Sequence, residues 1–274
     1  MKLSFVKMTG AGNDFVMLDN RDGSLSRILT AETIAFLCDR HFGIGADGLL
    51  AVETPSENGA DFRMRYYNSD GGEADMCGNG ARCFARFASV LRGDETSPLN
   101  FETRAGLIRA RFEKDGTVTV GLTAPHSLAL DVLPPSEVVP ASVHFVNTGV
   151  PHAVAFLPSV DDLDLAGTGA YLRYHPAFAP AGTNANYASI LGPQHLKIRT
   201  YERGVEAETL ACGTGMTATA LIHAALTDAP SPINIDVAGG CTLSIGFVRD
   251  GLSFSEVTLT GPATVVFRGS ITLP

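Results

Sequence analysis

The distribution of apolar and polar residues predicts a mixed α/β chain with many short strands and few helices. Apolar or alternating runs between glycine-rich turns predict strands at residues 3–7, 15–18, 49–53, 62–67, 100–103, 108–113, 117–122, 143–146, 153–157, 187–191, 197–202, 233–237, 242–249, 252–259 and 264–273. A short helix is predicted at about residues 30–42, with Thr30 as its N-cap.

A longer helix is predicted directly after Cys77. Apolar residues at positions 84, 87, 88 and 91 mark one face of this helix, and Gly93 can end it. A thiol at the start of a helix lies beside N–H groups without intrahelical acceptors and near the positive end of the dipole. That environment lowers a cysteine pKa and attracts a carboxylate, although a small buried cysteine in a glycine turn is an alternative.

The same arrangement occurs at Cys212, which precedes Gly213-Thr214-Gly215 as Cys77 precedes Gly78-Asn79-Gly80. The helix that follows, residues 216–226, is apolar nearly all round, which predicts a fully buried helix. The two thiols are 212 − 77 = 135 positions apart, about half of the 274 residues.

Four landmarks recur in one order along the two halves of the chain. Thr9-Gly10 matches Thr148-Gly149, the loop at Gly43 matches that at Gly182, Arg65-Tyr66-Tyr67 matches Arg199-Thr200-Tyr201, and Cys77-Gly78 matches Cys212-Gly213. This order indicates an internal duplication, with a boundary in the proline-rich tract at residues 125–140. We therefore expect two pseudo-symmetric lobes whose cysteine-headed helices meet at a cleft.

Composition and charge exclude several classes of function. With 20 basic and 29 acidic residues the net charge is −9, which argues against a nucleic-acid partner. The N-terminus has no secretory signal and no apolar run could span a membrane, so we expect a cytoplasmic protein. The five cysteines form no metal-ligand cluster, so neither zinc nor disulfides are expected.

Two glycine motifs could suggest a nicotinamide cofactor. The G-x-G-x-x-G run at residues 43–48 follows a helix and opens a strand, the reverse of the dinucleotide-binding order. Gly213-Thr214-Gly215 does open a helix, but the preceding strand ends near Glu202, too far away for a tight strand-to-helix turn. A nicotinamide-dependent oxidoreductase therefore remains only an alternative, and no cofactor or metal is expected.

Paired thiols at two helix N-termini fit a two-base inversion of a stereocentre. One thiolate removes a proton from one face of a carbon while the other thiol delivers a proton to the opposite face. The N–H groups of the two helix ends can bind an α-carboxylate and stabilise the developing carbanion.

The motifs together resemble the diaminopimelate epimerase family over essentially the whole chain. They are Gly10-Ala11-Gly12-Asn13-Asp14-Phe15, Phe42-Gly43-Ile44-Gly45-Ala46-Asp47-Gly48, Asn68-Ser69-Asp70-Gly71, Cys77-Gly78-Asn79-Gly80-Ala81-Arg82, Tyr201-Glu202-Arg203-Gly204 and Glu208-Thr209-Leu210-Ala211-Cys212-Gly213-Thr214-Gly215. The resemblance implies an α/β (α+β) fold of two lobes, each a curved, mostly antiparallel sheet around a central helix. The expected lobes are residues 1–124, joined by a returning strand at 263–274, and residues 125–262.

The resemblance implies a cofactor-independent homodimer that interconverts LL- and meso-diaminopimelate for lysine and peptidoglycan synthesis. It implies Cys77 and Cys212 as the base and acid. The other residues it implies are the α-carboxylate cradle of Gly78, Asn79, Gly213 and Thr214, the amine-side Asn13 and Glu202, the distal-end Asn68, Asn184 and Arg203, and His152 beside the catalytic pair.

Several alternatives remain beside these assignments. Val150 stands where many family members have asparagine, which puts one distal contact in question. A racemase of another amino acid could use the same scaffold, and so could a ligand-binding module, although a binding module would not need both thiols. Without other context, His152 would be a buried structural histidine, and Arg203 would pair with surface Glu206 or Glu208.

Overall fold

The computed structural model describes residues 1–56 and 59–273. The chain forms two compact units: unit 1 comprises residues 1–121 and 261–274, and unit 2 comprises residues 122–260. Within the described ranges, none of the helices has the length and apolar character that a membrane crossing requires.

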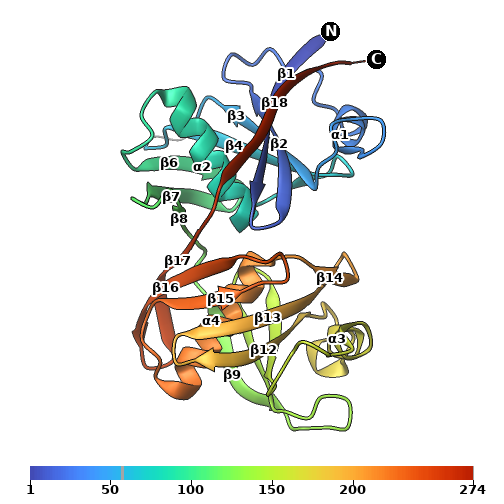
Figure 1. Ribbon diagram of the computed structural model, residues 1–274, viewed down its shortest axis with the longest axis vertical. Helices are drawn as coiled ribbons and strands as arrows, with labels where there is room; N and C mark the ends of the chain where they lie inside the picture. The colour runs from blue at the N-terminus through green and yellow to red at the C-terminus, as the bar shows by residue number, and fades with distance from the viewer. Residues whose placement is uncertain (57–58, 274) are drawn as a thin grey trace. The chain divides into compact units, whose positions relative to one another are not determined.

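Unit 1 is a mixed sheet with two helices (Figure 1). Its elements are β1 (Lys2–Gly10), β2 (Asn13–Asp19), α1 (Ala31–Cys38), β3 (Gly48–Glu53), β4 (Phe62–Asn68), β5 (Glu73–Ala74), α2 (Gly78–Arg92), β6 (Leu99–Thr103), β7 (Gly106–Phe112), β8 (Val118–Gly121) and β18 (Thr264–Thr272). The strands follow the order β18-β1-β2-β3-β4-β6-β7-β8, in which β2–β3 and β4–β6 are parallel pairs and the others antiparallel.

Unit 2 is built from β9 (His126–Leu133), β10 (Val143–Asn147), β11 (Pro151–Phe156), α3 (Leu165–Arg173), a 3₁₀ turn (Pro176–Phe178), β12 (Asn184–Gly192), β13 (His195–Glu202), β14 (Ala207–Thr209), α4 (Gly213–Thr227), β15 (Ile233–Asp236), β16 (Thr242–Asp250) and β17 (Ser253–Gly261). Its strand order is β9-β10-β11-β12-β13-β15-β16-β17, and β11–β12 and β13–β15 are the parallel pairs.

The two units repeat one topology. In each, the parallel and antiparallel pairs follow one another in the same order across the sheet, and β9 takes beside β10 the place that β18 takes beside β1. The predicted duplication and the mostly antiparallel sheets are therefore confirmed. The final strand also returns to unit 1, because β18 pairs with β1 from Lys2↔Thr272 onward and runs beside it in Figure 1.

One helix in each unit is packed against most of its sheet. Helix α2 contacts β1–β4, β6 and β8, and α4 contacts β10–β13, β15 and β16. Phe84, Phe87 and Ala88 on the predicted apolar face of α2 are buried, and Gly93 ends the helix in a left-handed conformation. Helix α4 is buried over all of residues 215–224, as its uniformly apolar sequence predicts.

The structure differs from the sequence prediction in several features, beginning with the end of the first helix. The first helix begins after the predicted cap, Thr30, but ends at Cys38 because the Asp39 carboxylate accepts hydrogen bonds from the N–H groups of His41 and Phe42. The proline-rich tract contains strand β9, which pairs with β10. Helix α3 was not predicted, because Gly167 and Gly169 weaken its helical signal.

Gly169 allows α3 to approach strand β13 closely. A Cβ atom at this position would lie 2.5 Å from Cβ of Tyr201, so a larger residue could not pack there without movement. A residue that reads as a helix breaker in the sequence is therefore a packing requirement between helix and sheet.

Candidate active site

Cys77 is the N-cap residue of α2. Its backbone is extended, with φ −138°, and its carbonyl accepts the first helical hydrogen bond from Ala81 N–H at 2.7 Å. The side chain is half-buried, while Gly78 and Asn79 in the first helical turn are buried. The predicted placement of this thiol at a helix N-terminus is what the structure shows.

Cys212 occupies the equivalent position in unit 2. It is the N-cap of α4, with φ −116°, and its carbonyl accepts from Met216 N–H at 2.9 Å. Its sulfur lies 3.5 Å from Oγ1 of Thr214, and Thr214 is held in place because its carbonyl accepts from the hydroxyl of Thr148 at 2.9 Å. Each unit therefore presents one thiol beside the positive end of a long buried helix.

The first turn of α4 also packs closely against Asn186. A Cβ atom on Gly215 would lie 2.4 Å from Oδ1 of Asn186 and 3.3 Å from the Cys212 sulfur. Asn186 is fully buried, so its side chain has little room to move. At the equivalent position in α2, a Cβ atom on Gly80 would meet Leu50 at 3.3 Å and Cys77 at 3.5 Å.

These contacts predict effects of different size for one substitution at two equivalent positions. Glycine to alanine inside a helix ordinarily gains about 1 kcal/mol. Gly215→Ala should instead lower the free energy of unfolding by about 1–3 kcal/mol, because Asn186 is displaced. The activity of Gly215→Ala should also fall at least tenfold. Gly80→Ala is the control, and it should lose less stability and less activity. Urea unfolding and initial rates measure both; equal behaviour of the two variants would contradict the prediction.

Asn13 and Asn79 are joined by a hydrogen-bonded network in unit 1. Asn79 Nδ2 donates to Asn13 Oδ1 at 2.7 Å, and Asn13 Nδ2 donates to Asp47 Oδ2 at 3.0 Å. At the other end, the fully buried Arg82 donates through Nη2 to Asn79 Oδ1 at 2.9 Å. The network links the first turn of α2 to the glycine-rich loop before β3.

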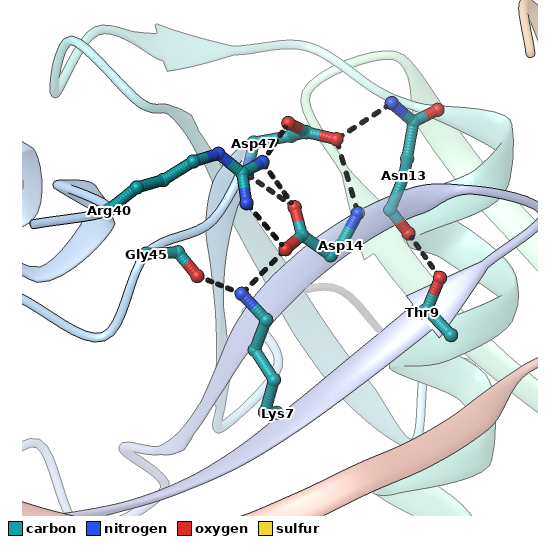
Figure 2. A network of polar contacts seen from close by, with 7 residues as sticks. All are labelled: Lys7, Thr9, Asn13, Asp14, Arg40, Gly45 and Asp47. Carbon is teal, nitrogen blue, oxygen red and sulfur yellow. Dashed lines mark hydrogen bonds and ion pairs between the residues drawn. The ribbon is translucent and has the colours of Figure 1, made fainter. Parts of the chain in front are cut away.

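A charged cluster surrounds Asp47 (Figure 2). Arg40 donates to both carboxylate oxygens of Asp14, at 2.9 and 3.1 Å, and to Asp47 Oδ1 at 2.7 Å. The buried Lys7 pairs with Asp14 at 2.8 Å and also donates to the carbonyl of Gly45. Burial alone would raise the pKa of Asp14, but hydrogen bonds from Arg40 and Lys7 lower it to about 2. Asp14 is therefore a carboxylate at neutral pH.

His152 and Asn184 lie on neighbouring strands of unit 2. His152 is fully buried, and Asn186 Nδ2 lies 3.1 Å from its Nδ1. Its Nε2 has no hydrogen-bond partner among residues 1–56 and 59–273. Asn184 accepts from the backbone N–H of Arg203 at 2.8 Å and donates to the carbonyl of Pro151 at 3.0 Å. The amide of Asn184 thus fixes the backbone at Arg203.

Arg203 does not pair with the surface glutamates. Glu206 pairs with Arg173 at 3.0 Å, and Glu208 pairs with Arg199 at 2.7 Å. The Arg203 guanidinium donates to the carbonyl of Ala181 at 3.2 Å, and it has no carboxylate partner in the described part of the chain. The alternative of a surface ion pair for Arg203 is therefore wrong.

Glu202 and Asn68 stand at equivalent strand ends of the two units but differ in their exposure to solvent. Burial raises the pKa of Glu202, at the end of β13, although the nearby Thr209 hydroxyl acts in the opposite direction. The Asn68 side chain, at the equivalent end of β4, is exposed. The structure thus places both residues at strand ends, as predicted, but only Glu202 in a partly desolvated environment.

The environment of His152 predicts a pH dependence of stability. Burial, and then the positive charge of Arg203, lower its pKa from 6.5 to about 3. Between these values the unfolded chain binds a proton that the native chain does not, so the free energy of unfolding falls as the pH decreases. The slope is at most about 1.4 kcal/mol per pH unit. His152→Gln lacks this titration, so it should lose less stability than wild type between pH 7 and 5 in urea unfolding; equal losses would contradict it.

Several residues of these networks were not foreseen from the sequence as functional. They are Lys7, Asp14, Arg40, Asp47 and Arg82 in unit 1, and Thr148, Asn186 and Thr200 in unit 2. The sequence contained a signal for Asp47 and Asn186, because they are 186 − 47 = 139 positions apart. The two Thr-Gly landmarks are separated by the same interval, 148 − 9 = 139. As for metals, the described residues contain no group of three or more His, Cys, Asp or Glu side chains that could hold one.

A protein-family model described as "Diaminopimelate epimerase" matches the chain twice, at residues 5–127 and 144–266. The two matches together cover most of both units. The repeated match agrees with the duplicated topology.

Curated proteins with the same name are similar to nearly the whole of this chain. The chain is 42% identical to the diaminopimelate epimerase of Chlorobaculum tepidum, covering 97% of this chain and all of that protein. It is 39% identical to the enzyme of Aquifex aeolicus, covering 98% of each chain. The chloroplastic diaminopimelate epimerase of Oryza sativa subsp. japonica is 42% identical over 98% of this chain and 80% of that protein.

Solved structures of distant sequence share the fold. A PhzF-family phenazine biosynthesis protein of Bacillus anthracis gives a TM-score of 0.72 at 14% identity, covering all of both chains. A probable proline racemase of Agrobacterium radiobacter gives 0.70 at 16% identity, covering 99% of this chain and 93% of that one. At such identities the likeness concerns the architecture alone.

Proposed function

Because the chain belongs to the diaminopimelate epimerase family and is an isomerase of lysine biosynthesis, we propose that Cys77 and Cys212 are its two catalytic bases. One thiolate removes the α-proton of LL- or meso-diaminopimelate, and the other thiol protonates the opposite face. The observation that carries this proposal is the duplicated placement of a thiol at the N-cap of a long helix in each unit.

The helix N-termini supply the binding site for the α-carboxylate in this proposal. The amides of Gly78, Asn79, Gly213 and Thr214 lie in the first turns of α2 and α4, where N–H groups point away from the helix. The same groups stabilise the negative charge that develops when the α-proton leaves. This mechanism requires neither metal nor cofactor.

The remaining residues recognise the amino group and the distal end. We assign Asn13 and Glu202 to the binding of the reacting amine, and His152 to the surroundings of the catalytic thiols. Asn68, Asn184 and Arg203 bind the distal amino-carboxylate. Support for Arg203 comes from its guanidinium, which has no carboxylate partner in the described part of the chain.

Solvent isotope exchange tests the proposed reaction. In D2O, wild-type enzyme should incorporate deuterium at the α-carbon of LL- and meso-diaminopimelate and equilibrate the two isomers without added cofactor. The same measurement on a panel of other amino acids separates an epimerase from a racemase with another substrate. Absence of exchange with diaminopimelate would sink the proposal.

We also propose a cytoplasmic homodimer formed by this chain, with residues 1–124 plus 263–274 and residues 125–262 as its functional lobes. The edge strand β18 supports self-association, because Val265, Val266 and Phe267 are 39%, 55% and 46% exposed. Exposed neighbouring apolar side chains on an edge strand favour burial against a partner. Sedimentation velocity at micromolar concentration should give a dimer mass, and a monomer there would contradict it. Cell fractionation tests the location.

A further inference from the structure

In each unit, one side chain forms a hydrogen bond with a proposed site residue, and the two hydrogen-bonded pairs lie at equivalent positions of the duplicated sequence. Asn13 and His152 are 152 − 13 = 139 positions apart, and Asp47 and Asn186 are 186 − 47 = 139 positions apart. Asn13 is bonded to Asp47 at 3.0 Å, and His152 is bonded to Asn186 at 3.1 Å. The same two positions are therefore hydrogen-bonded in both units, although the residue at each position differs between the units.

The chemistry of its neighbours fixes the orientation of Asn13. The Asp47 carboxylate can only accept, so the amino group of Asn13 must face it. At the other end of the network the guanidinium of Arg82 can only donate, so Oδ1 of Asn79 must face Arg82. The amino group of Asn79 is then left to meet Oδ1 of Asn13, as observed at 2.7 Å. The neighbours at both ends of the network therefore require that Asn79 donates to Asn13 and that Asn13 donates to Asp47.

In unit 2 the neighbours of Asn186 fix the proton on His152. The carbonyls of Ala153, at 2.9 Å, and Asn184, at 3.5 Å, can only accept, so they hold the amino group of Asn186 on their side. Thr200 donates its hydroxyl to Oδ1 of Asn186 at 3.0 Å, which agrees with that orientation. The amino group therefore donates to Nδ1 of His152, and in the neutral ring the proton must sit on Nε2.

We propose that Asp47 and Asn186 are equivalent positioning residues of the two units: Asp47 orients the amide of Asn13, and Asn186 holds His152 in its Nε2–H form. This inference rests on the proposed roles of Asn13 and His152. Asn13 keeps one N–H and one lone pair for the substrate in a fixed direction. His152 offers a donor, and not an acceptor, from Nε2.

The surroundings of the two positioning residues explain why position 47 carries a carboxylate and position 186 an uncharged amide. Asn13 is half-buried, and the carboxylate at position 47 that it contacts is stabilised by an ion pair with Arg40 at 2.7 Å (Figure 2). His152 and Asn186 are fully buried, and an uncharged amide avoids the cost of burying a carboxylate there. The duplicated pair thus keeps its geometry while the direction of donation is reversed between units.

A double-mutant cycle tests the role of Asp47. Asp47→Ala should lower kcat/KM with diaminopimelate about tenfold in wild type, but little further in an Asn13→Ala background. Arg40→Met is the control, because it removes contacts to Asp47 while leaving the acceptor of Asn13 intact; it should reduce kcat/KM less than threefold. Thermal unfolding verifies that the variants are folded.

Equal losses from Asp47→Ala in both backgrounds would overturn the role of Asp47, because they would mean that it acts independently of Asn13. An Asn13→Ala enzyme with full activity would overturn it too. Neither outcome touches the two-cysteine mechanism, which the deuterium exchange of wild-type enzyme tests separately.

The protonated ring nitrogen of His152 is observable by nitrogen-15 NMR of histidine-labelled protein. The His152 signals are assigned by their loss in His152→Gln. Wild type and Thr200→Val should both show a proton on Nε2, since Ala153 still orients Asn186 when Thr200 is changed. Asn186→Asp presents only acceptors, so it should move a proton to Nδ1 and lower activity at neutral pH.

A wild-type spectrum with the proton on Nδ1 would overturn the role of Asn186, whether or not Asn186→Asp folds. An unchanged His152 signal in folded Asn186→Asp would overturn it as well. The wild-type measurement requires no variant to be active, so the test stays independent of the catalytic assay.

Discussion

Cys77→Ala and Cys212→Ala are each expected to abolish epimerisation while the protein remains folded. In the proposed mechanism each thiol serves one face of the α-carbon, so one cannot replace the other, and the loss of an obligatory acid or base costs about 10²- to 10⁴-fold or more. Both cysteines are N-cap residues outside the helix interior, and alanine removes only a small side chain there. Initial rates in both directions measure the effect, with circular dichroism as the check on folding.

The other cysteines provide matched controls. Burial raises the pKa of Cys38 and Cys83 to about 12, so both remain thiols at neutral pH. Cys83 lies on the same helix as Cys77 but in its interior, and it is fully buried. Cys38→Ala, Cys83→Ala and Cys241→Ser should retain most activity. More than a few per cent of activity in Cys77→Ala or Cys212→Ala would show that the two-base assignment is wrong.

The second large effect is expected at Arg203. If its guanidinium binds the distal carboxylate, Arg203→Ala loses a charge-assisted hydrogen bond of about 1.5–3 kcal/mol. At about 1.4 kcal/mol per tenfold, kcat/KM with diaminopimelate should fall roughly ten- to a hundredfold or more. A surface ion pair would contribute less than about 1 kcal/mol, and the structure shows that Glu206 and Glu208 have other partners.

Lysine separates the distal role of Arg203 from a general one. Wild-type enzyme should discriminate against lysine, which lacks the distal carboxylate, and Arg203→Ala should lose much of this preference. Arg199→Ala is a control in β13, the strand that Arg203 directly follows, because Arg199 pairs with Glu208. Equal relative losses of kcat/KM for both substrates in Arg203→Ala would place Arg203 at the α-amino-acid end or in the structure alone.

The sequence predicted the elements whose signals are local. The N-cap at Thr30 and the C-cap at Gly93 depend on neighbouring residues, and both lie where the pattern placed them. The positions of Cys77 and Cys212 at helix N-termini were predicted for the same reason, since each directly precedes its own helix. The duplication could be recognised in the sequence because four landmarks occur in the same order in both halves.

Contacts between distant residues could not be predicted in this way. Asn13 and Asp47 are 34 positions apart, as are His152 and Asn186, and only the parallel pairing of their strands brings them together. Strand β9 was not predicted because it lies in a proline-rich tract. Its backbone is also irregular, since Ser127 and Asp131 adopt positive φ, which strand residues rarely do. Such features depend on tertiary neighbours that a single sequence does not display.

The pairing of β18 with β1 determines the order in which the two units can be completed during synthesis. Unit 2 is a continuous stretch ending at residue 260, so all of its strands exist before β18 is made. Unit 1 begins first but keeps the edge of β1 unpaired until residues 264–272 have emerged. The half of the protein that is translated first is therefore finished last, and β1 must be protected from wrong pairing throughout the synthesis of unit 2.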